Sequence, residues 1–77
     1  MKNVLILGAN GQIARIVAKR LLSEQDDVQL TLYLRKSHRV DDLVAINPTR
    51  VRTVDADIHD QETLDKAVQG QDIVFIS

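Results

Sequence analysis

Residues 4–14 read Val4-Leu5-Ile6-Leu7-Gly8-Ala9-Asn10-Gly11-Gln12-Ile13-Ala14. The four apolar residues at the start are typical of a strand, and a helical pattern begins at Gln12. Two glycines lie between them, at the spacing of a dinucleotide phosphate loop. Gly8 can adopt backbone angles that other residues avoid, and Gly11 has no Cβ to keep a diphosphate away from the backbone. The stretch therefore predicts a strand, a phosphate-binding turn and a helix start.

The predicted helix start suits an anion. The first N–H groups of a helix have no partner within it, and they lie at the positive end of the helix dipole. Asn10, Gln12 and Ile13 are therefore candidate binding residues beside the two glycines. The alternative is a tight strand-to-helix turn that binds nothing, because glycine clusters also occur in ordinary turns. A second strand-like segment one βαβ unit later favours phosphate binding.

Composition restricts the class of protein. The chain has 77 residues, 44% of them hydrophobic and 27% charged, and a net charge of −1, which is typical of one small globular domain. One tyrosine and one phenylalanine are too few for a base-stacking surface, so we expect no nucleic-acid partner. The absence of cysteine excludes disulfides and thiolate metal sites. The apolar run at residues 4–7 is too short for a signal peptide or a membrane span, which predicts a cytoplasmic protein.

The spacing of apolar residues predicts the remaining elements. They are a helix over 12–23, a strand over 28–34, a short helix over 40–46, a strand over 50–55, a helix between the N-cap Asp60 and the C-cap Gly70, and a strand over 72–77. The alternation of strands and helices predicts a Rossmann-like α/β fold: a parallel sheet in the order 3-2-1-4 with three helices, as an incomplete doubly wound fold.

The apolar residues of the helices predict which sides are buried. The first helix has an apolar stripe that consists of Ile13, Val17, Leu21, Ala14, Ala18 and Leu22. Ala14 is small enough to let this helix lie close to the first strand. On the third helix, Leu64, Ala67 and Val68 are expected on the inner face.

This arrangement has consequences for the two edges of the predicted sheet. Arg50 and Arg52 are interpreted as charges that protect the edge formed by the third strand. The fourth strand is an apolar edge, and only one helix covers one of the two faces. We therefore expect the chain alone either to self-associate through the uncovered sheet face and the edge of the fourth strand, or to behave as an unstable fragment.

A cationic run, Arg35-Lys36-Ser37-His38-Arg39, follows the second predicted strand. In dinucleotide-binding folds an acid at this position accepts hydrogen bonds from the adenosine ribose, whereas an arginine there accommodates a 2′-phosphate. Arg35 lies about twenty residues after the glycine loop, and no acid occupies its position. Lys36, His38 or Arg39 can add further charge. We therefore expect NADP(H) rather than NAD(H). The alternative is a solvated run of charges in a loop.

Further candidates follow the third and fourth predicted strands. Asp57 can accept a hydrogen bond from the amine of adenine, and Ile58 can pack on the ring. The alternative is that Asp57 only shapes the turn before the next helix. Ser77 ends the last strand, where we expect a backbone contact with the cofactor. Tyr33 is interpreted as a strand residue and His59 as a surface residue, so the sequence offers no catalytic or metal-binding constellation.

Taken together, these features resemble the N-terminal part of atypical short-chain dehydrogenases/reductases, in their NmrA-like and NAD(P)H-binding branch. They are Gly8-x-x-Gly11-x-x-Ala14, Arg35, Asp57-Ile58 and the strand over 72–77. One departure is Ala14, where the family often has glycine. The resemblance implies that residues 1–77 are the N-terminal part of an NAD(P)-binding Rossmann domain.

The same resemblance implies an oxidoreductase whose later strands supply the nicotinamide and substrate sites. Many members of this family carry a tyrosine followed four positions on by a lysine. Here Tyr33 is followed by Lys36, at the wrong spacing. Two alternatives remain open at this point: a regulator that senses NADP(H) without turnover, and a structural fragment without a ligand.

Overall fold

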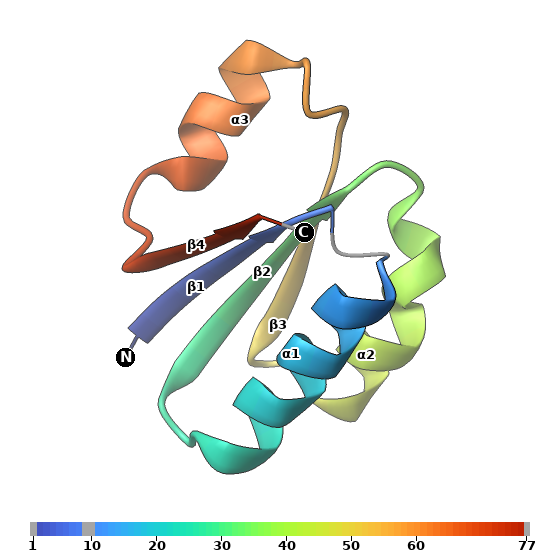
Figure 1. The fold of residues 1–77 in the computed structure, drawn as a ribbon, viewed down its shortest axis with the longest axis vertical. Helices are drawn as coiled ribbons and strands as arrows, with labels where there is room; N and C mark the ends of the chain where they lie inside the picture. The colour runs from blue at the N-terminus through green and yellow to red at the C-terminus, as the bar shows by residue number, and fades with distance from the viewer. Residues whose placement is uncertain (1, 9–10, 77) are drawn as a thin grey trace.

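The computed structural model describes residues 2–8 and 11–76, in which strands and helices alternate along the chain (Figure 1). The elements are β1 (Lys2–Leu7), α1 (Gln12–Glu24), β2 (Val28–Leu34), the 3-10 helix η1 (Ser37–Val40), α2 (Asp41–Ile46), β3 (Val51–Asp55), α3 (Gln61–Val68) and β4 (Ile73–Ile76). The strands form one parallel sheet in the order β3-β2-β1-β4. The predicted Rossmann-like α/β fold is confirmed, and so is its strand order.

Two local predictions about the helices need correction. The cationic run was expected to be a loop, but its second half forms η1, because Val40 at the end of that turn is buried in the core. α3 ends one residue earlier than expected, with Gln69 as its C-cap. Gly70 follows at φ 78°, the left-handed conformation that commonly ends a helix and that glycine adopts without strain.

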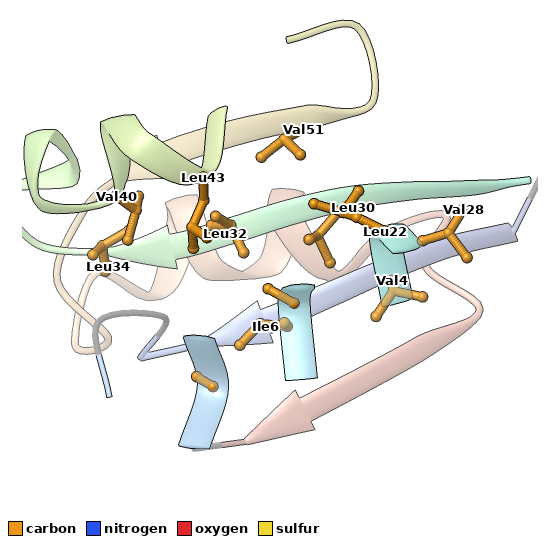
Figure 2. Packing of buried hydrophobic residues seen from close by; sticks show 12 residues of the cluster. Val4, Ile6, Leu22, Val28, Leu30, Leu32, Leu34, Val40, Leu43 and Val51 are labelled. Atoms are coloured by element: carbon orange, nitrogen blue, oxygen red, sulfur yellow. The ribbon is translucent and has the colours of Figure 1, made fainter. Parts of the chain in front are cut away.

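The larger part of the core lies between the sheet and the α1–α2 layer. Side chains of a strand alternate between the two faces, so every second residue of β1 and β2 points toward these helices. Figure 2 shows this packing, in which Leu43 of α2 and Leu22 of α1 contact the sheet. The buried members of the cluster are Val4, Ile6, Ala14, Ala18, Leu22, Val28, Leu30, Leu32, Leu34, Val40, Leu43 and Val51.

On the opposite face of the sheet, α3 is the only covering helix within residues 2–8 and 11–76 (Figure 1). The buried cluster on this face consists of Leu5, Leu7 and Tyr33, and Leu64 and Ala67 of α3 pack against it. Val68, which was expected on the inner face of this helix, is 41% exposed. The predicted division of helices between the faces is therefore confirmed, with a thin layer on the α3 side.

The first helix buries a narrower stripe than the apolar spacing suggested. Ala14, Ala18 and Leu22 face the sheet and are buried. Ile13, expected in the same stripe, is 68% exposed because it lies at the open end of α1 beside the glycine loop. The small alanines allow the helix to lie close to the strands, as expected of Ala14.

The two edges of the sheet differ in charge. On β4, the side chains of Ile73, Val74 and Ile76 are exposed, and this strand pairs only with β1 among the described residues. On β3, Arg52 is exposed, which agrees with its expected role at the edge.

The same role expected for Arg50 is wrong. Its Nε donates to the carbonyl oxygen of Val28 at 3.1 Å and its Nη1 to that of Leu22 at 3.2 Å, and Nη2 donates to the carbonyl of Gln25. The last carbonyls of a helix have no partner within it, and the guanidinium of Arg50 satisfies that of Leu22 in the last turn of α1 and that of the C-cap Gln25. Arg50 therefore joins α1, β2 and the start of β3.

Candidate functional site

The loop after β1 forms the turn that the glycines predict. Gly8 has φ 74°, in the left-handed region that favours glycine, and its N–H donates to the carbonyl oxygen of Tyr33 at 2.8 Å. Gly11 is the N-cap of α1, and its N–H donates to the carbonyl of Gly8 at 3.2 Å. Asn10, a predicted binding residue, lies outside the described residues. The backbone is thus bent back at the carboxyl end of β1, where α1 begins.

The start of α1 has no counter-charge from the described part of the chain. No side chain there caps the helix, and its first turn contains no acidic residue. Gln12 and Ile13 are the first two helical residues, and both are exposed. Because the first amides of a helix point outward along its axis, this end can accept an anion.

A cavity of about 470 Å³ lies at the carboxyl ends of β1, β2 and β3, and we call it the main cavity because of this location. A larger one, of about 600 Å³, lies between α1 and the end of α2, away from these strand ends. Two oppositely charged side chains meet at the main cavity: Arg35 Nη1 lies 3.6 Å from Asp57 Oδ2. The main cavity is lined by Gly8, Tyr33, Leu34, Arg35, Ala56, Asp57, Ile58 and His59. Ligands of open α/β sheets bind outside the carboxyl ends of the strands, so the cavity has the expected location.

Asp57 is held in a turn by two further contacts. Its Oδ1 accepts from the N–H of His59 at 2.9 Å, and its carbonyl oxygen accepts from the hydroxyl of Tyr33 at 2.7 Å. The carboxylate therefore shapes the turn, as the alternative interpretation held, and it also lines the main cavity. Ile58, beside it, is 50% exposed and lines the same cavity.

Tyr33 is a structural residue of the site that the sequence did not single out. It is buried at 1% exposure, as expected of a strand residue, but its hydroxyl reaches the connection after β3. Burial raises the pKa of its phenol, and the negative charges of Asp60 and Asp57 raise it further. The hydroxyl is therefore protonated at neutral pH and acts as a donor.

A smaller cavity, of about 300 Å³, lies on the loop after β2. It is lined by three cationic residues, Arg35, Lys36 and Arg39, and we call it the cationic cavity. Arg39 belongs to η1, whose position is fixed from α1: Arg15 Nη1 donates to the carbonyl of Arg39 at 3.3 Å. Arg15 also forms an ion pair with Asp42 of α2. The cations are thus attached to packed helices at one end and to β2 at the other.

Asp55 is the functional-site residue that sequence reasoning missed. Its Oδ1 accepts from the N–H of Lys36 at 3.1 Å, and its Oδ2 accepts from the N–H and the Oγ of Ser37 at 3.1 and 3.2 Å. These hydrogen bonds, above all that from the Ser37 amide, lower the pKa of Asp55. The sequence has no local signal for this contact, because it depends on the pairing of β3 with β2, which places Asp55 in register with Leu34.

The remaining predictions concern Ser77, His59, metal binding and membrane spans. Ser77 lies beyond the last described residue. His59 is exposed, as expected. Within residues 2–8 and 11–76, no cluster of three or more acidic, histidine or cysteine side chains could hold a metal ion. Over the same residues, no helix has the length and apolar character needed to span a bilayer.

Comparison with known proteins identifies the fold family. In sequence, the protein YmjC of Escherichia coli (strain K12) is 50% identical over 40 residues, which are 52% of this chain and 65% of that protein. In structure, the chain superposes on a short-chain dehydrogenase/reductase (wide type) from Veillonella parvula DSM 2008 in complex with NADP, with a TM-score of 0.85 and 31% identity. It also superposes on a Rossmann-fold NAD(P)-binding family protein from Shigella flexneri, with a TM-score of 0.84 and 40% identity.

The two solved relatives are much longer than this chain. The superpositions cover 97% and 100% of this chain, but only 34% of the Veillonella protein and 37% of the Shigella protein. The family model described as NAD(P)H-binding matches residues 8–77, which is nearly the whole sequence. The chain therefore belongs to the NAD(P)H-binding family.

Proposed function

We propose that this chain binds NADP(H) as the cofactor-binding module of an oxidoreductase similar to short-chain dehydrogenases/reductases. We further propose that residues 1–77 are the N-terminal part of an NAD(P)-binding Rossmann domain. Family membership supports a dinucleotide, and the cations at the end of β2 support the form with a 2′-phosphate.

The pyrophosphate fits the start of α1. Gly8 supplies the bend, and Gly11 presents no side chain toward a ligand that approaches the backbone. The absence of an acidic or capping side chain among the described residues of this turn leaves its positive end for the phosphates. Gln12 and Ile13 contribute their amides, and we place Asn10 and Ser77 beside them as further contacts.

The adenine fits the main cavity. Ile58 offers an exposed apolar side chain to one face of the ring. The carboxylate of Asp57 lies in the wall of the same cavity and can accept a hydrogen bond from the exocyclic amine. Its Oδ1 is already bonded to the amide of His59, so the oxygen nearer Arg35 is the one we assign to the ligand.

The cationic cavity is the observation that carries the preference for NADP(H). Arg35, Lys36 and Arg39 line it together, and the side chain of Arg35 is 70% exposed and accessible to a ligand. Arginine presents a planar, permanently charged fork that matches phosphate oxygens. The nearby acid, Asp55, already accepts three hydrogen bonds from the loop, so it is poorly suited to accept from a ribose hydroxyl. The Veillonella relative was crystallised in complex with NADP.

The residues of this chain bind and orient the cofactor, whose nicotinamide supplies hydride transfer when bound. Tyr33 is not assigned a catalytic role, because its side chain is buried and its hydroxyl is bonded to the carbonyl of Asp57. We place the substrate site and the reacting groups outside these residues.

Calorimetric titration of the chain with NADPH, NADH and 2′,5′-ADP tests the proposal. We expect NADPH and 2′,5′-ADP to bind, and NADH to bind at least about tenfold more weakly. Arg35→Asp should reverse this preference, since an acid at this position accepts from the ribose hydroxyls. Arg20→Asp is the matched control, because it makes the same charge change on an exposed arginine of α1 paired only with Glu24 among the described residues. Failure of the parent chain to bind NADPH and 2′,5′-ADP would overturn the proposal.

A further inference from the structure

The loop that carries the cations is attached to the neighbouring strand by a single carboxylate. Asp55, the last residue of β3, accepts from the amides of Lys36 and Ser37 and from the hydroxyl of Ser37, at 3.1, 3.1 and 3.2 Å. No other hydrogen bond among the described residues joins a side chain of β3 to this loop. Asp55 therefore ties this loop to β3, in addition to its attachment to β2 and to the contact of Arg15 with Arg39.

The backbone of this loop has an unusual conformation. Lys36 has φ 57° and ψ 62°, and among the described residues it is the only one other than glycine with a positive φ. Left-handed backbone is unfavourable for a residue with a Cβ, so neighbouring contacts must stabilise it. In this conformation the amides of Lys36 and Ser37 both reach the carboxylate of Asp55. The same turn leads the chain from Arg35 at the end of β2 into η1, which carries Arg39.

The cationic cavity brings together three positive charges that repel one another. Among the described residues, its lining consists of Arg35, Lys36 and Arg39 and includes no acid. Asp55 does not line this cavity, but its carboxylate binds the backbone of the residues that do. It can therefore fix the loop and supply a nearby negative charge without occupying the space of a ligand.

We propose that Asp55 is a positioning residue for recognition of the 2′-phosphate: it holds the 35–39 loop in the conformation that brings Arg35, Lys36 and Arg39 around one anion. This inference rests on the proposed binding of NADP(H) and assigns a specificity role to a residue that does not touch the cofactor. Because Asp55 already occupies the amides of Lys36 and Ser37, the phosphate is recognised by the cationic side chains and not by these backbone groups.

Asp55→Ala in the full chain tests this role, with NADPH and NADH as probes in calorimetric titrations. We expect the affinity for NADPH to fall about tenfold, because the loop no longer holds the three cationic side chains around one phosphate. The affinity for NADH should change less than about twofold. Asp55→Asn keeps one carbonyl acceptor for the loop amides, so it should retain part of the preference for NADPH. It also keeps the proposal testable if Asp55→Ala does not fold.

Asp26→Ala is the matched control for charge. Asp26 is an exposed acid in the turn between α1 and β2, away from the carboxyl ends of the strands, and its removal changes the net charge equally. The proposal predicts no change in the NADPH preference of this variant. An equal loss of NADPH and NADH affinity in Asp55→Ala, or unchanged or tighter NADPH binding, would contradict the positioning role. The proposed function fails separately, if the parent chain itself does not bind NADPH.

Discussion

The hydroxyl of Tyr33 donates a hydrogen bond of 2.7 Å to the backbone carbonyl of Asp57. This contact joins β2 to the connection between β3 and α3, and both residues line the main cavity. It leaves the carboxylate of Asp57 facing Arg35 at 3.6 Å. A buried residue of a central strand thus fixes the turn that presents an acid to the cavity.

Tyr33→Phe should lower the melting temperature by about 5 °C, because it keeps the ring but leaves the part-buried carbonyl of Asp57 without this donor. Thermal unfolding followed by circular dichroism measures the change. We also expect weaker binding of NADPH, since the turn of Asp57 and Ile58 loses an anchor. An unchanged melting temperature and unchanged binding would mean that the hydrogen bond contributes nothing to the site.

Asp55 makes the stability of the chain depend on pH. Its pKa is lowered in the folded state, so the folded chain binds a proton less readily than the unfolded chain. This contribution is fully present above the ordinary pKa of an aspartate and is lost as the pH falls through the lowered value. Urea unfolding between about pH 7 and about pH 3 should show a shallower loss of stability for Asp55→Asn than for the parent. Parallel curves for the two proteins would contradict this assignment.

Arg50→Lys should destabilise the chain by about 2 kcal/mol, because lysine cannot reproduce the fork that reaches three carbonyls. Arg52→Lys is the matched control, with the same chemical change two residues away on an exposed side chain. Its free energy of unfolding should change by less than about 0.5 kcal/mol. Equal effects of the two substitutions in urea unfolding would argue against the role of Arg50 at the end of α1.

The apolar edge of β4 predicts self-association of the 77-residue chain. Ile76 is 72% exposed on this edge, and strand edges without charges pair readily with another chain. Light scattering after size-exclusion chromatography should give a mass that rises with concentration, and Ile76→Lys should lower it. Thr53→Lys, which adds the same charge on the opposite edge strand, should have no such effect. A parent chain that remains a compact monomer and melts cooperatively would contradict the prediction.

The topology could be predicted from the sequence because the order of the elements and the glycine loop each restrict how the strands can be arranged. Alternation of strands and helices requires parallel crossovers, and the glycine loop after β1 indicated the doubly wound order, which the sheet confirms. The N-cap Asp60 was also predictable, since its side chain accepts from the amide of Thr63 at 3.2 Å within one helical turn. These signals are local or follow from periodicity.

The contacts that build the site depend on which strands become neighbours. Asp55 reaches Lys36 across 19 positions of sequence, and Arg50 reaches Leu22 across 28. Neither contact has a local signal, because a polar residue at a strand end is equally compatible with a solvated position. Sequence reasoning therefore identified the cations of the loop but missed the carboxylate that holds it, and it assigned Arg50 to an exposed edge.

The turn between β1 and α1 is the part of the chain that we propose binds the pyrophosphate of a dinucleotide. A substitution of Gly11 tests this with less strain on the backbone than one of Gly8. Gly11 has φ −67° and ψ 150°, which any residue can adopt, whereas Gly8 has a positive φ. Gly11→Val should therefore fold, with a loss of about 1 kcal/mol at the N-cap, and place a branched side chain where the pyrophosphate approaches.

Calorimetric titration of NADPH into the parent chain and into folded Gly11→Val is the most direct measurement. The account predicts binding to the parent and a loss of at least about a hundredfold in the variant. Equal affinity for NADPH in the two folded proteins would contradict it.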